Sequence, residues 1–136
     1  MNSTTSDNTK KTIVIVDDEK SFCDLVSFFL NKAGFQVKCF TDAQEALQNI
    51  TNINTDLILL DIDMPKINGF NFIAYLKKDL NEKCPPILFL TNLTYDNSGN
   101  LIDDEYAKSM VTLGVIHKTA DIEVIINKIK SIFQNN

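Results

Sequence analysis

Five short runs of apolar, mostly β-branched residues recur along the chain and alternate with stretches of helical character. This alternation is typical of βα units wound around a parallel sheet. Nearly continuous apolar runs should be strands covered on both faces, whereas the second run mixes in polar residues and should lie nearer an edge. The expected strands are residues 12–16, 35–40, 56–60, 86–91 and 114–118. The pattern predicts an α/β fold of (βα)5 type, with a doubly wound five-stranded parallel sheet in the flavodoxin-like order 2-1-3-4-5.

The segments between these runs carry apolar residues at helical spacing. The first helix should have Leu25 on its buried side and end at Gly34, a residue type that commonly follows a helix. Thr41, with Gln44 three residues later, has the pattern of a capping box and should open the second helix. Residues 91–105 contain a DNSGN stretch typical of a loop. The fourth helix should follow this loop and bury Ile102, Tyr106, Met110 and Leu113.

The composition fits one globular domain that neither spans a membrane nor binds nucleic acid directly. No apolar run of the 136 residues approaches the ~20 residues that cross a bilayer. The net charge is -5, all 13 basic residues are Lys, and these form no stripe that could follow a phosphate backbone. Residues 1–10 should form a disordered polar tail and residues 11–136 the domain. Because the tail has no apolar signal segment, a cytoplasmic location is expected.

The cysteines give no sign of a disulfide framework or a metal site. Cys23, Cys39 and Cys84 are odd in number, widely spaced and set within apolar patterns. They are therefore predicted to be reduced thiols in or near the core.

Polar residues follow the predicted strands at their carboxyl ends. The first strand ends in Asp17 and Asp18, the third in Asp61, the fourth in Thr91 and the fifth in Lys118. Strands one and three are neighbours in the order 2-1-3-4-5, and ligands of such sheets bind beyond the carboxyl ends where the order reverses. The three aspartates should therefore meet in one crevice.

Three carboxylates in one crevice repel each other unless a cation lies between them. A few oxygen ligands with room for water and phosphate suit Mg²⁺ better than Ca²⁺. Asp61 is the best candidate for a nucleophile toward a phosphoryl group, with the Thr91 hydroxyl and the Lys118 ammonium binding its oxygens. Each residue alone has a simpler interpretation, as a cap, a turn residue or a surface charge. Only their combination at the carboxyl ends of strands indicates phosphoryl transfer.

These motifs together resemble the receiver domain of two-component response regulators. The resemblance covers roughly residues 11–134 and is carried by IVIVDDE at 13–19, LLDIDMPKINGF at 59–70, FLT at 89–91 and the strand-ending Lys118. It implies a receiver fold, of the stand-alone single-domain type because only QNN follows the last predicted helix. It also implies a cytoplasmic signalling protein that catalyses only its own phosphorylation and dephosphorylation on aspartate.

The resemblance assigns a role to each of these residues. It implies Asp61 as the phosphoacceptor, with Thr91 and Lys118 contacting the phosphoryl group. It also implies that Mg²⁺ is held by Asp17, Asp18, Asp61 and the main-chain carbonyl of Asp63. The Asp63 side chain adds a negative charge beside the site, and our hypothesis is that it tunes the lifetime of the phosphoryl group.

Three features depart from the family pattern. Thr119 follows Lys118 where the family usually has Pro, often with a cis bond, so Thr119 could instead cap the last helix. Val115 stands where the family commonly has an aromatic residue whose rotamer reports phosphorylation. The segment that follows Thr91 is several residues longer than is usual in the family.

Three functions are compatible with this sequence. The favoured one is a phosphoacceptor that receives a phosphoryl group from the phosphohistidine of a histidine kinase or histidine phosphotransfer protein. It would then change its affinity for a downstream protein target, as a monomer or a weak phosphorylation-linked dimer. The second is a small haloacid-dehalogenase-like phosphatase, because LILLDIDM resembles the D-x-D motif of that class, although the motif order is reversed. The third is a phosphate-independent pseudo-receiver that acts as an interaction module.

Overall fold

The computed structural model describes residues 10–110 and 112–134. Five parallel strands form one sheet in the order β2-β1-β3-β4-β5, as the sequence predicts. They are β1 (Thr12–Val16), β2 (Gln36–Phe40), β3 (Leu57–Asp61), β4 (Ile87–Thr91) and β5 (Val115–His117). The helices are α2 (Lys20–Lys32), α3 (Ala43–Ile50), α4 (Gly69–Leu80), α5 (Asp104–Ser109) and α6 (Ile122–Gln134), and a 3₁₀ turn, η1 (Asn81–Lys83), follows α4. Apart from Lys10, the predicted tail 1–10 lies outside the described residues.

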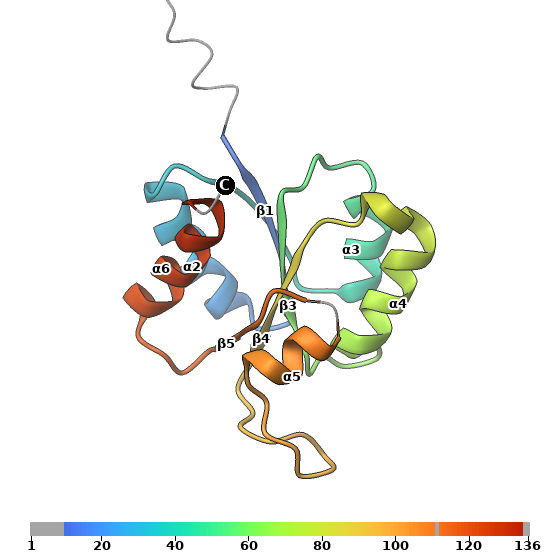
Figure 1. Cartoon of the computed structure of the whole chain (residues 1–136). Coiled ribbons are helices and arrows are strands. Elements are labelled where there is room, and N and C mark those ends of the chain that lie inside the picture. The colour runs from blue at the N-terminus through green and yellow to red at the C-terminus, as the bar shows by residue number, and fades with distance from the viewer. Residues whose placement is uncertain (1–9, 111, 135–136) are drawn as a thin grey trace, which may run out of the picture.

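The sheet separates two layers of helices. Helices α2 and α6 cover one face, and α3, α4 and α5 cover the other (Figure 1). Every residue of β3 and β4 is buried, whereas β2 at the edge has only exposed and half-buried residues. Burial on both faces explains the continuous apolar runs of the central strands, and the prediction that the second strand lies at an edge is confirmed.

Several local predictions were wrong. Leu25 is exposed, because α2 buries Cys23, Val26 and Leu30 instead. The cap of α3 is Asp42, whose side chain accepts hydrogen bonds from the main-chain N–H groups of Gln44 and Glu45, so Thr41 lies one residue too early.

The fourth helix is shorter than its apolar pattern predicts. Helix α5 begins after Asp103, whose side chain caps it, so that Ile102 lies before the helix and only Ala107 within it is fully buried. Thr94 to Ile102 instead form a small ribbon, in which Tyr95 pairs with Leu101 in antiparallel fashion. This ribbon projects from the carboxyl edge of the sheet (Figure 1).

The prediction that all three cysteines are reduced was also wrong. Cys23 and Cys39 form a disulfide, with their Cα atoms 6.2 Å apart, and Cys84 stays free. The β1–α2–β2 crossover lays the first turn of α2 against β2, which brings together two cysteines 16 residues apart. Sequence spacing gives no sign of this pairing. Disulfides form mostly in oxidising compartments, so the cytoplasmic location stays a prediction.

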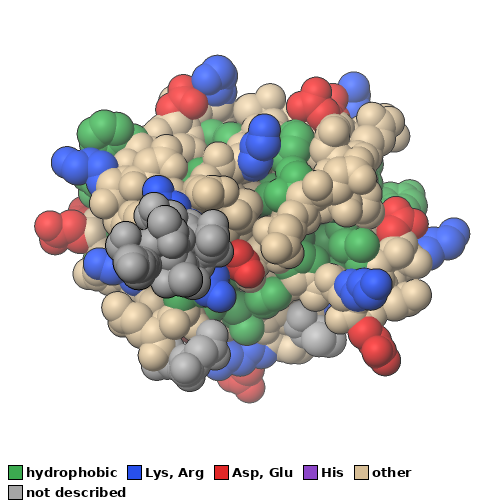
Figure 2. Space-filling view, turned by 90° about the horizontal axis from the view of Figure 1, so that it is seen from above, with side chains coloured by type: hydrophobic (Ala, Val, Ile, Leu, Met, Phe, Trp, Pro, Cys, Tyr) green, Lys and Arg blue, Asp and Glu red, His purple; other side chains and the backbone are tan. Residues whose placement is uncertain are grey.

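The two ends of the sheet differ in character. On the side where the strands begin, charged side chains of both signs are scattered among uncharged ones, without a single-sign stripe (Figure 2). Three of the buried polar residues, Asp17, Asp61 and Thr91, lie at the other end, where the strands finish, whereas buried Thr112 precedes β5. No helix of the described residues is both long and apolar enough to cross a membrane.

Candidate functional site

The register of the sheet brings the strand-end carboxylates together. Val16 of β1 pairs with Leu60 of β3, so the residues that follow them, Asp17 and Asp61, lie beside each other. Asp18 is exposed at the same edge, and one carboxylate oxygen from each of the three aspartates lies within 4.8 Å of the others. The predicted crevice is therefore present.

The loop after β3 is held tightly against the strand end. The main-chain N–H of Asp63 donates to Asp61 Oδ1 (3.1 Å), and that of Gly69 donates to the carbonyl of Ile62 (2.8 Å). A Cβ on Gly69 would lie 2.9 Å from Ile62 Cα and 3.0 Å from the Asp61 carbonyl oxygen. Only glycine allows α4 to begin this close to the carboxylate-bearing strand.

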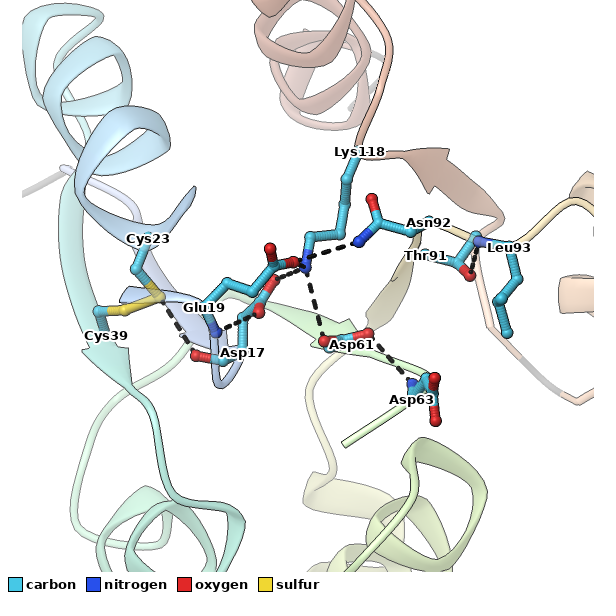
Figure 3. Close-up of polar contacts among 10 residues, drawn as sticks. All are labelled: Asp17, Glu19, Cys23, Cys39, Asp61, Asp63, Thr91, Asn92, Leu93 and Lys118. Atoms are coloured by element: carbon cyan, nitrogen blue, oxygen red, sulfur yellow. Dashed lines mark hydrogen bonds and ion pairs between the residues drawn. A yellow bond between two sulfur atoms is a disulfide. The ribbon is translucent and has the colours of Figure 1, made fainter. Parts of the chain in front are cut away.

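Lys118 follows β5 and reaches across the edge to these carboxylates (Figure 3). Its ammonium lies 2.8 Å from Asp17 Oδ2 and 3.6 Å from Asp61 Oδ2, and it also bonds Glu19 Oε1. The Lys118 side chain is only 3% exposed. The chain around Lys118 is trans, since the described residues contain no cis peptide bond. Thr119 lies in the following turn, and α6 begins directly after Asp121, so Thr119 does not occupy the cap position.

Thr91 is fully buried at the end of β4, beside β5. Its hydroxyl oxygen accepts a hydrogen bond from the main-chain N–H of Leu93 (2.9 Å), which orders the start of the following segment. A hollow at this edge is lined by side chains from three loops: Asp18, Glu19, Asp61, Asp63, Asn92 and Leu93. His117 is half-buried on β5.

Burial and charge perturb the ionisable groups of this edge. Burial, together with the neighbouring Asp17 carboxylate, raises the pKa of Asp61 to about 7, although the Asp63 N–H and Lys118 act in the opposite direction. Burial alone would lower the pKa of Lys118, but its bonds to Asp17 and Glu19 and the Asp61 charge outweigh this effect and raise it. The Lys118 bond lowers the pKa of Glu19. Lys118 therefore stays an ammonium, and its single positive charge does not balance the carboxylates around Asp61.

One buried atom indicates where a cation would bind. Asp17 Oδ2 accepts no well-directed hydrogen bond from the described residues, although the Lys118 ammonium lies 2.8 Å away. A buried carboxylate oxygen without such a bond is costly, and a divalent ion among three carboxylates would remove that cost. The donor set at this edge, oxygen only, fits Mg²⁺.

A model of the response regulator receiver domain matches residues 13–130. The chain belongs to this family. Receiver domains are signalling switches of two-component systems, and they generally bind Mg²⁺ in an acidic pocket. The phosphatase interpretation finds no support in this family membership.

Solved structures and a relative of similar sequence agree with this family assignment. The chemotaxis protein CheY4 of Vibrio cholerae has a TM-score of 0.76 at 27% identity, and the match covers 90% of this chain and 98% of that one. A two-component response regulator from Clostridium difficile has a TM-score of 0.75 at 25% identity, over 92% and 97% of the two chains. The regulatory protein VanRc of Enterococcus gallinarum is 40% identical over 79 residues, which are 58% of this chain and 33% of VanRc. The chain thus spans about a third of that relative.

Two residues of this edge were missed by the sequence analysis. Glu19 directly follows the predicted acidic pair, and Asn92 directly follows Thr91, so position alone could have identified both. Their side chains meet across the mouth of the hollow, where Asn92 Nδ2 donates to Glu19 Oε1 (3.2 Å; Figure 3). The direction of these side chains is set by tertiary packing and carries no sequence signal.

Proposed function

We propose that the protein is the phosphoacceptor of a two-component system or phosphorelay, with Asp61 as the residue that takes the phosphoryl group. The observation that carries this proposal is the cluster itself. Asp61 is 4% exposed, has the carboxylates of Asp17 and Asp18 within 4.8 Å, and has a buried lysine ammonium 3.6 Å away. A carboxylate beside two others and one cation is suited to transfer of an anionic group once a metal balances the charge.

The metal site would be Mg²⁺ held by Asp17, Asp18, Asp61 and the main-chain carbonyl of Asp63. When bound, Mg²⁺ supplies positive charge to the phosphoryl oxygens. The protein's own contribution is to hold its ligands in place. The Asp63 N–H fixes Asp61 Oδ1 at 3.1 Å, and the Glu19 N–H fixes Asp17 Oδ1 at 2.9 Å, so that Oδ2 of each carboxylate faces the Lys118 ammonium.

The donor would be the phosphohistidine of a histidine kinase or histidine phosphotransfer protein. An oxygen of Asp61 attacks phosphorus, the O–P bond forms as the P–N bond breaks, and the imidazole leaves and takes a proton. The ammonium of Lys118 and the hydroxyl of Thr91 bind the phosphoryl oxygens as their charge is redistributed. The phosphorylated form then changes its affinity for a downstream protein target, as a monomer or a weak phosphorylation-linked dimer.

The test is intact mass after incubation with Mg²⁺ and a small acyl-phosphate donor. We expect one added phosphoryl group on the wild type, and none on Asp61→Asn or after chelation of the metal. Asp56→Asn is a matched control, because Asp56 lies at the other end of β3, where it caps the main-chain N–H of Thr12 (2.8 Å). A phosphoryl group that persists in Asp61→Asn would contradict the assignment.

Two further measurements separate the alternatives. Turnover of a simple phosphate ester would favour the phosphatase. Binding of Mg²⁺ should be lost in Asp17→Asn. Because the chain has no Trp whose fluorescence could report binding, calorimetry or NMR is used to measure it. A wild type that binds no Mg²⁺ would favour the pseudo-receiver.

A further inference from the structure

Lys118 is held by a residue outside the set assigned above. Its ammonium bonds Glu19 Oε1 and lies 2.8 Å from Asp17 Oδ2, whereas Asp61 Oδ2 is 3.6 Å away. The ring centroid of Phe22 lies 4.9 Å from the same nitrogen. The lysine is thus closer to two other carboxylates than to the one that would carry the phosphoryl group.

Glu19 is itself fixed from two sides. Its main-chain N–H donates to Asp17 Oδ1 (2.9 Å), which sets the direction of the loop after β1. Its Oε1 accepts from Asn92 Nδ2 (3.2 Å) as well as from Lys118. Figure 3 shows the Lys118 ammonium and, beyond it, the Asn92 amide on the same side of this carboxylate. Glu19 therefore connects the segments that follow β1, β4 and β5.

We propose that Glu19 is a positioning residue, anchored by Asn92, that holds the Lys118 ammonium away from Asp61, so that a phosphoryl group on Asp61 must compete with Glu19 for this lysine. The inference rests on the proposed roles of Asp61 and Lys118. It adds a residue that acts through Lys118 and never touches the reacting atoms.

The physical reason is the balance of charge around one ammonium. A phosphoryl group replaces the single negative charge of the Asp61 carboxylate with about two, and these attract Lys118 from a distance of a few ångströms. For Lys118 to approach the phosphoryl group, the interactions that hold its ammonium at Glu19 must break. The free energy of these interactions therefore reduces the stabilisation that Lys118 gives to the phosphoryl group. Glutamine at position 19 would keep the shape and one acceptor oxygen but remove the competing charge.

The experiment compares initial rates of phosphorylation by a small acyl phosphate with Mg²⁺, followed by intact mass at about 0.15 M salt to screen long-range charge. We expect Glu19→Gln to react about threefold to tenfold faster than the wild type, because a competing ion pair of ordinary strength is lost. Glu19→Asp retains the charge and should react at a rate near that of the wild type. Asn92→Ala should be faster by a smaller factor.

Two controls separate positioning from a general loss of negative charge. Glu45→Gln removes the same charge from an exposed residue in the first turn of α3, without contact to Lys118, and should leave the rate unchanged. In a Lys118→Met background, measured at raised donor concentration, Glu19→Gln should have no effect, because the lysine through which it acts is gone.

Three outcomes would overturn the inference. The first is an equal rate for Glu19→Gln and the wild type. The second is the same gain in the Lys118→Met background, which would show that Glu19 acts on the donor by charge alone. The third is a wild type that takes up no phosphoryl group, which would overturn the proposed function as well. A wild type that is phosphorylated on Asp61 while Glu19→Gln is unchanged would overturn only the role of Glu19.

Discussion

Two of the lysines that pair with carboxylates, Lys118 and Lys128, differ in what surrounds them. Lys118 is buried at the carboxyl edge of the sheet and faces Asp17, Glu19 and Asp61. Lys128 of α6 is about a third exposed and faces one carboxylate, that of Asp104, together with the carbonyl of Val115 (2.8 Å). Both lysines join elements that are distant in the sequence.

The pKa values of Asp61 and Asp104, the aspartates of the two clusters, are shifted in opposite directions. Burial and the neighbouring Asp17 raise the pKa of Asp61 to about 7. Burial also acts to raise the pKa of Asp104, but hydrogen bonds from Lys128 and from the Val115 N–H outweigh it, and the pKa falls below its usual value. The clusters differ in burial and in number: the Asp61 side chain is 6% exposed and that of Asp104 is 51% exposed, and three carboxylates share Lys118 whereas one carboxylate has Lys128. The cluster with too little positive charge is the one for which we propose a cation, and the balanced one joins α6 to α5 and β5.

The largest effect should come from removing the lysine of the unbalanced cluster. Lys118→Met leaves Asp17 and Asp61 buried without a cation, so we expect the metal-free protein to lose about 3 kcal/mol of unfolding free energy at neutral pH. Urea unfolding followed by circular dichroism measures this loss. Millimolar Mg²⁺ should recover a large part of it, because the ion would bind among the same carboxylates. A loss that Mg²⁺ leaves unchanged would contradict a cation site at this edge.

The next effect concerns pH. The pKa of Asp61 is raised in the folded state, so the folded protein binds this proton more tightly than the unfolded chain does. The contribution of Asp61 to stability is therefore present at low pH and is lost as the pH rises from the ordinary carboxyl range to about 7.

This dependence should disappear in Asp61→Asn, because the asparagine does not titrate. At pH 8 without metal, the variant should be more stable than the wild type by about 2 kcal/mol, after allowance for screening by solvent. The difference in unfolding free energy between the two proteins, followed from pH 4 to pH 8, isolates Asp61 from the other groups. A constant difference over this range would contradict a raised pKa.

Much of the fold follows from the hydropathy pattern alone. Strands β3 and β4 are buried along their whole length and therefore appear as continuous apolar runs. The order of the sheet then places Asp17 beside Asp61 without any knowledge of side-chain positions. Features that depend on single-residue register were predicted less well. Thr41 and Asp42 are both good caps, and only the backbone geometry selects Asp42.

The parts of the site that sequence reasoning missed are contacts between loops. The main chain of Glu19 belongs to the loop after β1, and that of Asn92 to the segment after β4, so their hydrogen bond joins residues 73 positions apart. The Cys23–Cys39 disulfide depends in the same way on the packing of α2 against β2. Such pairs arise from tertiary structure, and the sequence around one partner does not indicate which residue the other partner is.

The smallest effect should come from the balanced cluster. Lys128→Met removes an exposed ammonium from Asp104, and we expect it to cost about 0.5–1 kcal/mol of unfolding free energy. The variant retains Asp104, whose Oδ1 still accepts from the Val115 N–H (2.9 Å), so the junction of α5 and β5 should survive. The same urea unfolding measures this loss, and added salt should reduce it because the pair is exposed. Mg²⁺ should stabilise Lys128→Met as much as it stabilises the wild type. If Lys128→Met instead costs as much as Lys118→Met, or weakens the response to Mg²⁺, then burial and the count of carboxylates do not distinguish the two lysines, and the cation site would have to extend to α6.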